Sequence, residues 1–134
     1  MKISSRGRYA VRVMTELAQN PNKLFSVAEL SAVQNISTKY LEKIISLLTK
    51  ANLIESTRGA LGGYKLTKKP NEYSIAEILA STKDLPELAP CLCKENSCPQ
   101  KESCSSINCW EKLNLIILDY LKGVSLQNLI DKKI

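Results

Sequence analysis

Residues 26–48 read Ser26-Val-Ala-Glu-Leu-Ser-Ala-Val-Gln-Asn-Ile-Ser-Thr-Lys-Tyr-Leu-Glu-Lys-Ile-Ile-Ser-Leu-Leu48 and contain two helical patterns separated by a turn. Ser26 and Glu29 match the Ser-x-x-Glu pattern, in which each side chain satisfies a free backbone N–H near the other residue, so a helix is expected to begin here. Its expected inward positions are Val27, Leu30 and Val33. Residues 34–36 are interpreted as a tight turn.

The second pattern begins at Ser37, which is expected to cap a longer helix. Its apolar side chains recur at three- and four-residue steps: Leu41, Ile44, Ile45 and Leu48. Its other side is polar: Thr38, Lys39, Glu42, Lys43 and Ser46. Two short helices joined by a tight turn are typical of the helix-turn-helix, which reads DNA in many proteins but also occurs by chance.

A basic hairpin is predicted directly after these helices. The strand-like runs 54–57 and 64–67 flank Arg58-Gly-Ala-Leu-Gly-Gly63, whose glycines permit a tight turn. A hairpin in this position is typical of a wing, and its arginine suits a narrow minor groove or phosphates. The alternative is an ordinary turn with a solvated arginine.

Two further helices are expected to complete a unit of residues 1–83. Ser4 or Ser5 caps the first, and residues 20–22, Asn-Pro-Asn, end it. Its apolar face is formed by Ala10, Val13, Met14 and Leu17. Ser74 opens the second, whose inward residues are Ile75, Ile78 and Leu79.

Positive charge is concentrated in this unit. Residues 1–83 hold 13 Lys and Arg against 6 Asp and Glu, whereas residues 84–134 hold 6 against 7, for a formal net charge of +6. Such an imbalance favours a polyanion as the partner of the first unit. Lysines that only solvate helix faces are the alternative.

All five cysteines lie between Cys91 and Cys109, spaced C-x-C-x4-C-x5-C-x4-C. Residues 84–103 are expected to form a cysteine-rich sensor loop, which begins with the proline-bounded linker 85–90. No signal peptide or membrane-spanning run is expected, so a cytoplasmic location is predicted. Thiols remain reduced there, which favours metal or redox chemistry over a disulfide framework. Zinc is an alternative, although the paired C-x2-C spacing of structural zinc sites is missing.

A long helix is expected after Cys104 and is predicted to end at Gly123, followed by a short helix over 125–130, so residues 104–134 form a third unit. Its apolar positions extend nearly around the helix: Ile107, Trp110, Leu113, Leu115, Ile116, Ile117, Leu118 and Leu121. Such a helix needs cover on more than one side. We therefore expect it to form a homodimer, the alternative being a core helix within one chain.

Four stretches together resemble the IscR/NsrR/CymR family of bacterial winged-helix regulators. They are Ser5-Arg-Gly-Arg-Tyr-Ala-Val11, Ile36-Ser-x-x-Tyr-Leu-Glu42, Arg58-Gly-x-x-Gly-Gly-Tyr64, and the triplet Cys91, Cys98 and Cys104 followed by Trp110. The resemblance covers nearly the whole chain. It implies a mainly α fold with a small β-hairpin wing, a winged helix-turn-helix plus a long C-terminal dimerisation helix, and binding to a palindromic operator in double-stranded DNA.

The resemblance also implies which residues meet DNA. They are Arg6 and Tyr9 near phosphates; Ser37, Thr38, Lys39, Tyr40, Glu42 and Lys43 on the recognition helix; and Arg58, Gly62 and Gly63 in the wing. Glu42 can accept from cytosine but repels phosphate, so it is expected to discriminate among sites without adding general affinity.

The resemblance further implies an iron–sulfur cluster of the 2Fe-2S or 4Fe-4S type, held by Cys91, Cys98 and Cys104, whose thiolates suit such clusters. The sequence departs from the family pattern here, because Ile107 stands where the iron–sulfur-biogenesis regulator has a histidine, and the chain contains no histidine. The fourth ligand would be Cys93, Cys109, a residue of the second subunit or none. A cluster-free regulator controlled by thiol oxidation, or by a bound metabolic enzyme, is the alternative.

An enzymatic function is not expected. The chain has no histidine and no nucleotide-binding glycine loop, and no base is placed beside a nucleophile.

Overall fold

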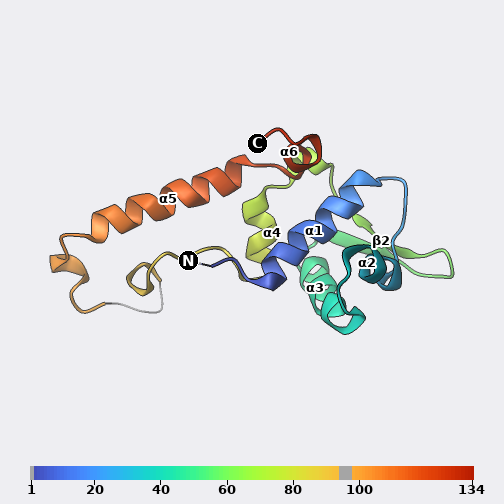
Figure 1. The fold of residues 1–134 in the computed structure, drawn as a ribbon, viewed down its shortest axis with the longest axis horizontal. Coiled ribbons are helices and arrows are strands. Elements are labelled where there is room, and N and C mark those ends of the chain that lie inside the picture. Colours follow the sequence, from blue (N-terminus) through green and yellow to red (C-terminus); the bar gives the residue numbers. More distant parts are fainter. Residues whose placement is uncertain (1, 94–97) are drawn as a thin grey trace.

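The computed structural model describes residues 2–93 and 98–134, so residues 94–97 of the segment 84–103 lie outside the described residues. The helices are α1 (Ser5–Gln19), α2 (Val27–Gln34), α3 (Thr38–Lys50), α4 (Ile75–Ser81), α5 (Ile107–Gly123) and α6 (Leu126–Asp131). The strands are β1 (Ile54–Thr57) and β2 (Gly63–Leu66), and short 3-10 turns cover Pro70–Glu72, Pro90–Leu92 and Lys101–Ser103. The predicted mainly α fold with a hairpin is confirmed, and α5 projects from the body that the other elements form (Figure 1).

Serine caps start the helices where the sequence predicts them. Ser4 caps α1 through its side-chain oxygen. At the start of α2, the Ser26 hydroxyl accepts from the Glu29 N–H at 3.1 Å while the Glu29 carboxylate accepts from the Ser26 N–H at 2.8 Å. The Ser37 hydroxyl accepts from the N–H of Tyr40 at 3.3 Å at the start of α3. These bonds satisfy donors that a helix start otherwise leaves free.

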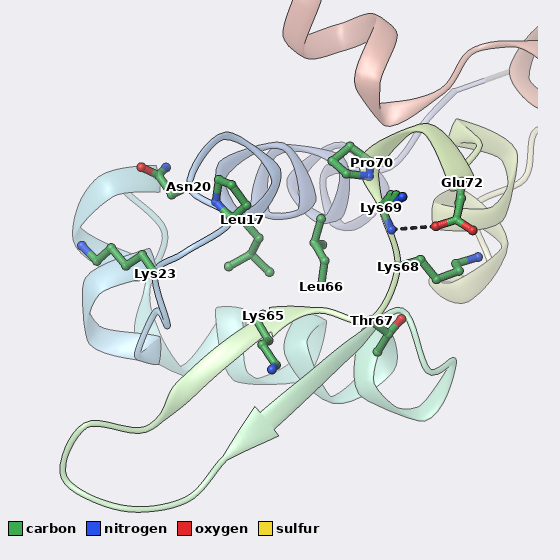
Figure 2. A pocket seen from close by; sticks show the side chains of 11 residues that line it. Leu17, Asn20, Lys23, Lys65, Leu66, Thr67, Lys68, Lys69, Pro70 and Glu72 are labelled. Atoms are coloured by element: carbon green, nitrogen blue, oxygen red, sulfur yellow. Dashed lines mark hydrogen bonds between the residues drawn. The ribbon is translucent and has the colours of Figure 1, made fainter.

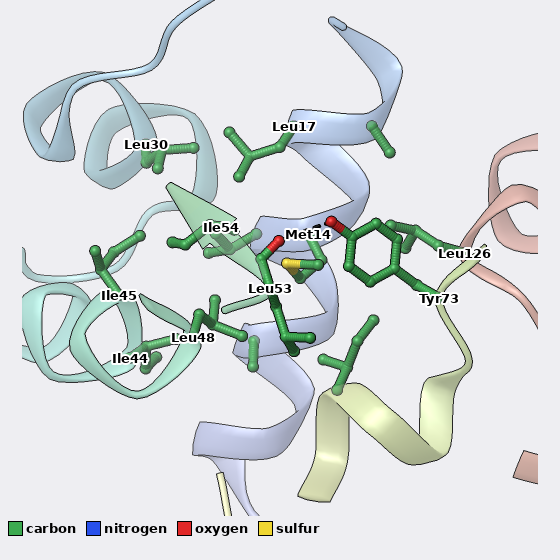
Figure 3. Close-up of a cluster of buried hydrophobic side chains, with 14 of the residues drawn as sticks. Met14, Leu17, Leu30, Ile44, Ile45, Leu48, Leu53, Ile54, Tyr73 and Leu126 are labelled. Carbon is green, nitrogen blue, oxygen red and sulfur yellow. Dashed lines mark hydrogen bonds between the residues drawn. The ribbon is translucent and has the colours of Figure 1, made fainter. Parts of the chain in front are cut away.

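The apolar faces of α1, α3 and α4 meet in one core (Figure 3). Side chains with no exposed surface include Ala10, Val13, Met14, Leu41, Ile44, Leu48 and Ile78. Tyr73 is buried among them, and its hydroxyl donates to the Leu53 carbonyl at 2.8 Å and accepts from the N–H groups of Thr67 and Lys68 at 2.9 Å each. The phenol therefore fixes the chain that leaves the hairpin.

The prediction that Val33 lies in the core is wrong. Val33 on α2 is 55% exposed, whereas the next residue, Gln34, is only 8% exposed. Arg12 and Glu16 of α1 hydrogen-bond the Gln34 side-chain amide at 3.0 and 3.1 Å. A polar group can be buried when it is hydrogen-bonded, so the amide takes the inward position that apolar periodicity assigned to Val33.

The hairpin pairs β1 and β2 in antiparallel register from Ile54 opposite Leu66 to Thr57 opposite Gly63. A second connection joins its base to the body, because the backbone groups of Phe25 and Tyr64 form two hydrogen bonds of 3.2 and 2.8 Å. The hairpin is thus fixed beside the segment that precedes α2.

Helix α5 buries none of its residues completely, whereas the chain beyond it returns to the body. Leu126 of α6 has no exposed surface, and the Ile75 N–H donates to the Val124 carbonyl at 2.9 Å. Helix α6, which the sequence grouped with the long helix, packs against α1 and the turn Pro70–Glu72. None of the described helices combines the length and apolar character required to cross a bilayer.

Gly7 lets the chain after α4 approach the start of α1. A Cβ at position 7 would lie 2.9 Å from the Asp84 Cβ and 3.1 Å from the Leu79 Cδ2. The Asp84 carboxylate, 8% exposed, accepts a 3.2 Å hydrogen bond from the Arg6 Nε. This contact fixes the chain to α1 just before it continues toward the cysteines.

We predict that Gly7→Ala destabilises the protein, although alanine favours a helix by about 1 kcal/mol over glycine. The added methyl group would overpack the contact with Asp84, which typically costs about 1–3 kcal/mol. Chemical denaturation followed by circular dichroism measures the change. Gly123→Ala is the matched control, because a Cβ there has open space, and it should not destabilise the chain. A Gly7→Ala protein as stable as the wild type would contradict the close approach.

Candidate nucleic-acid interface and cysteine segment

The N-terminal part of α3 presents polar side chains to solvent while its other side is buried in the core. Ser37, Thr38, Lys39, Glu42 and Lys43 are exposed, as a groove-reading surface requires. The apolar stripe on the opposite side holds the helix against the core, so these side chains stand on a rigid support.

A groove runs between this face and the start of α1. It is lined by Ser4, Ser5, Arg6, Lys39, Tyr40, Glu42, Lys43, Ser46, Leu47 and Lys50. Four of the lining side chains are cationic, namely Arg6, Lys39, Lys43 and Lys50, and one, Glu42, is a carboxylate. Such a groove is suited to a phosphate backbone, which binds cations irrespective of base sequence. The structure therefore brings Arg6 together with four of the predicted residues, Lys39, Tyr40, Glu42 and Lys43, whereas Ser37 and Thr38 do not line the groove.

Sequence reasoning missed the far end of this groove. Lys50 was not among the predicted residues, and Ser46 was described only as exposed. The signal was present in the helical spacing, since positions three and seven residues after Lys43 lie on the same face. Lys50 extends the cationic edge about two turns beyond Lys43.

Tyr9 lies beside α3 but does not line the groove. Its ring is half-buried and meets the ring of Tyr40 edge-on, with centroids 5.9 Å apart and an interplanar angle of 79°. The Arg12 guanidinium lies 5.3 Å from the Tyr9 ring centroid. Tyr9 therefore connects α1 to α3 through ring contacts.

The wing exposes Arg58, and its glycines are required by backbone contacts. A Cβ at Gly62 would lie 2.0 Å from the Thr57 carbonyl oxygen, and one at Gly63 would lie 2.7 Å from that of Phe25. Leu61 at the tip is 93% exposed. Gly62 and Gly63 thus shape and seat the hairpin, which leaves Arg58 as its charged contact.

The described residues include all five cysteines, and no disulfide joins them. Cys98 and Cys109 are exposed, and the other three are partly exposed. The predicted triplet is not gathered, because the described chain contains no group of three Cys, Asp or Glu side chains close enough to hold a metal ion. The thiol chemistry suits an iron–sulfur cluster, but this arrangement of a single chain does not form its ligand set.

Two of the thiols lie in contrasting environments. Hydrogen bonds from the side chain and backbone of Ser106, and from the backbone of Ile107, lower the pKa of Cys104 and favour its thiolate. The Cys93 thiol instead donates to the Glu87 carboxylate at 2.7 Å. The surroundings of Cys104 therefore favour the thiolate, which is the form that binds metals.

A second hollow lies between the end of α1, strand β2 and residues 67–72 (Figure 2). Its lysines are already paired with carboxylates in three cases: Lys23 with Glu29 at 3.7 Å, Lys65 with Glu55 at 3.4 Å and Lys68 with Glu77 at 2.9 Å. In the groove beside α3, by contrast, Arg6 is the one cation of four that has an ion pair among the described residues, with Asp84. That groove is therefore the stronger candidate for a polyanion.

Comparison with known proteins agrees with this geometry. The Rrf2 family model, described as iron-dependent transcriptional regulator, matches residues 3–132. An HTH-type transcriptional regulator of Neisseria meningitidis is 39% identical, over 99% of this chain and 90% of that protein. The HTH-type transcriptional regulator IscR of Aliivibrio salmonicida is 35% identical, over 97% of this chain and 77% of the relative.

Solved structures give the same result. CymR, the global cysteine regulator of B. subtilis, matches with a TM-score of 0.79 and 27% identity, covering 100% of this chain and 99% of that one. IscR of T. potens matches with a TM-score of 0.75 and 29% identity, covering 98% and 88%. The resemblance drawn from the four sequence stretches is confirmed. The chain belongs to the Rrf2 family of winged helix-turn-helix transcriptional regulators.

Proposed function

We propose that this regulator is a cytoplasmic homodimer that binds a palindromic operator through α3 and the wing and is controlled through its cysteine segment. The observation that carries the proposal is the cationic groove between α1 and the exposed N-terminal face of α3. It lies beside a hairpin whose exposed charge is Arg58.

Phosphate contact and base reading fall to different residues of this surface. Arg6, Lys39, Lys43 and Lys50 are suited to phosphates, which give affinity without sequence preference. Thr38 and Glu42 lie on the exposed side of α3, where short polar side chains can reach base edges in the major groove. We assign sequence discrimination to these two residues.

The dimer is supported by the apolar side chains that α5 leaves exposed. They are Trp110, Leu113, Leu115, Ile116 and Tyr120, with exposed fractions between 41 and 58%. Several large apolar side chains exposed on one projecting helix are unfavourable in water and are typical of a subunit interface. A second copy of the same helix supplies a matching surface, as two-fold symmetry requires.

Control through the segment has two chemical forms. The first is an iron–sulfur cluster on Cys91, Cys98 and Cys104, supported by the iron-dependent description of the family and by the thiolate-favouring surroundings of Cys104. It requires the segment to rearrange, because the three thiols are apart in the described chain. The second is thiol oxidation without a cluster, supported by a related CymR structure described as an oxidized form, with 29% identity. The alternative to both chemical forms is control by a bound metabolic enzyme, which needs no change at the thiols.

DNA binding is tested with the duplex most enriched by the wild-type chain from a random library. Arg58→Ala should weaken binding to this duplex and to a scrambled one alike, and should lower the slope of log affinity against log salt by about one counterion. Lys122→Ala removes a charge from α5 instead and should leave the slope unchanged. An unaltered slope for Arg58→Ala would remove the wing from the interface, and a wild-type chain that enriches no sequence would contradict operator binding.

Cluster binding is tested by anaerobic purification from iron-replete cells, with iron and sulfide analysis and an absorption spectrum. The wild type should be coloured, and Cys98→Ala should lose iron while remaining a folded dimer. The iron contents of Cys93→Ala and Cys109→Ala are then compared. The variant that contains less iron than the wild type identifies the fourth ligand. A colourless, iron-free wild type would exclude the cluster and favour thiol oxidation or a protein partner.

The dimer is tested by placing a charge on α5. Ile116→Lys should convert the protein to monomers in sedimentation velocity, because a buried charge without a partner is strongly unfavourable at an apolar interface. Val33→Lys is the matched control, since Val33 on α2 is 55% exposed and Ile116 is 57% exposed. An Ile116→Lys protein that remains dimeric would place the subunit contact elsewhere.

A further inference from the structure

A polar link joins the middle of α1 to the end of α2. The Arg12 guanidinium donates from Nε to the Gln34 side-chain oxygen at 3.0 Å and from Nη2 to the Gln34 main-chain carbonyl at 2.7 Å. The Gln34 amide nitrogen donates to the Glu16 carboxylate at 3.1 Å. Three side chains from two helices thus form one connected network.

The network holds α2 at the point where the chain turns toward the recognition helix. Gln34 is the last residue of α2, and Asn35 after it adopts a left-handed conformation with φ 53° and ψ 50°. A cation is favourable at a helix C-terminus, where carbonyl groups lack partners within the helix. Arg12 satisfies one of these carbonyls with a short charge-assisted bond and so fixes the start of the turn.

The same guanidinium also acts on α3 through two aromatic rings. It lies over the Tyr9 ring, and that ring meets Tyr40 edge-on. Tyr40 is in the first turn of α3 and lines the groove that faces DNA. Arg12 is therefore connected to the recognition helix from both sides, through the turn before it and through the aromatic pair beside it.

A direct contact between Arg12 and a phosphate is the competing interpretation, because the residue is exposed and cationic. Two features oppose it. Nε and Nη2 are committed to Gln34, and Arg12 is not among the residues that line the groove beside α3. Its charge is directed at the end of α2.

We propose that Arg12 is a positioning residue for DNA reading, which sets the tilt and depth of α3 without touching the duplex. This inference rests on the proposed operator binding. Loss of the two bonds from Arg12 to Gln34 should weaken binding to the preferred sequence, because base reading depends on placing side chains against base edges. General binding to phosphates should not change.

The test compares Arg12→Lys with Arg8→Lys, since both variants keep their positive charge on α1. Lysine has one amine and cannot make both bonds to Gln34 in the fork geometry of arginine. We expect Arg12→Lys to bind the enriched duplex about tenfold more weakly, from the loss of about one charged hydrogen bond. Its affinity for the scrambled duplex and its salt slope should be unchanged. Arg8, whose guanidinium bonds only the Ser5 hydroxyl among the described residues, should tolerate lysine without effect on either duplex.

A second variant keeps the inference testable if Arg12→Lys is poorly folded in thermal unfolding. Gln34→Met removes the side-chain bonds of the network but leaves the carbonyl that Arg12 reaches, so it should cause a smaller loss on the enriched duplex alone. Unchanged affinity in the folded variants would overturn the proposal. Arg12→Ala, which removes the charge, tests the competing interpretation. If it lowers the affinity for both duplexes equally and lowers the slope of log affinity against log salt by about one, Arg12 contacts a phosphate directly. If the wild type binds the enriched duplex and Arg12→Lys binds it with the same affinity, only the positioning role is refuted and the proposed operator binding stands.

Discussion

Burial of the apolar face of α1 is the interaction on which the rest of the structure depends. Ala10, Val13 and Met14 have no exposed surface, and α1 packs against α3, α4, α6 and β2. Burial of a side chain the size of Val13 or Met14 contributes about 1.5–3 kcal/mol, so the contact is both strong and central. Helix α3, strand β2 and the returning helix α6 are thereby held by one common element.

The polar edges of α1 place charge around this core. Arg12 reaches the end of α2, while Arg6 lies at the groove and bonds Asp84, where the chain continues toward the cysteines. Burial alone would raise the pKa of Asp84, but hydrogen bonds from Ser4 and Thr82, together with the bond and charge of Arg6, lower it overall. The stability from this carboxylate is therefore present at neutral pH and is lost only in acid, as pH falls through the lowered folded-state pKa. The start of α1 is thus tied to both the groove beside α3 and the path to the cysteine segment.

The cysteine segment and α5 differ from this body. Few of their side chains are deeply buried, and the thiols are not gathered around one point in the described residues. A segment with few buried contacts can change arrangement at small energetic cost. The chemical control that we propose for this segment would act on the body through the contact of Asp84 with Arg6 before it and the contact of Val124 with Ile75 after α5, without disturbing the core.

The sequence by itself determined the local elements. Serine caps and apolar spacing predicted the helix starts and the buried stripe of α3, and the glycines after Arg58 predicted the hairpin, because these depend on near neighbours in the chain. The tertiary structure decided what depends on residues far apart. It buried Gln34 in place of Val33, because Arg12 and Glu16 supplied partners. It packed α6 against α1, and it placed Arg6 in one groove with the α3 residues from Lys39 to Lys50. It did not bring the described thiols together, since spacing along a chain does not fix distances across it.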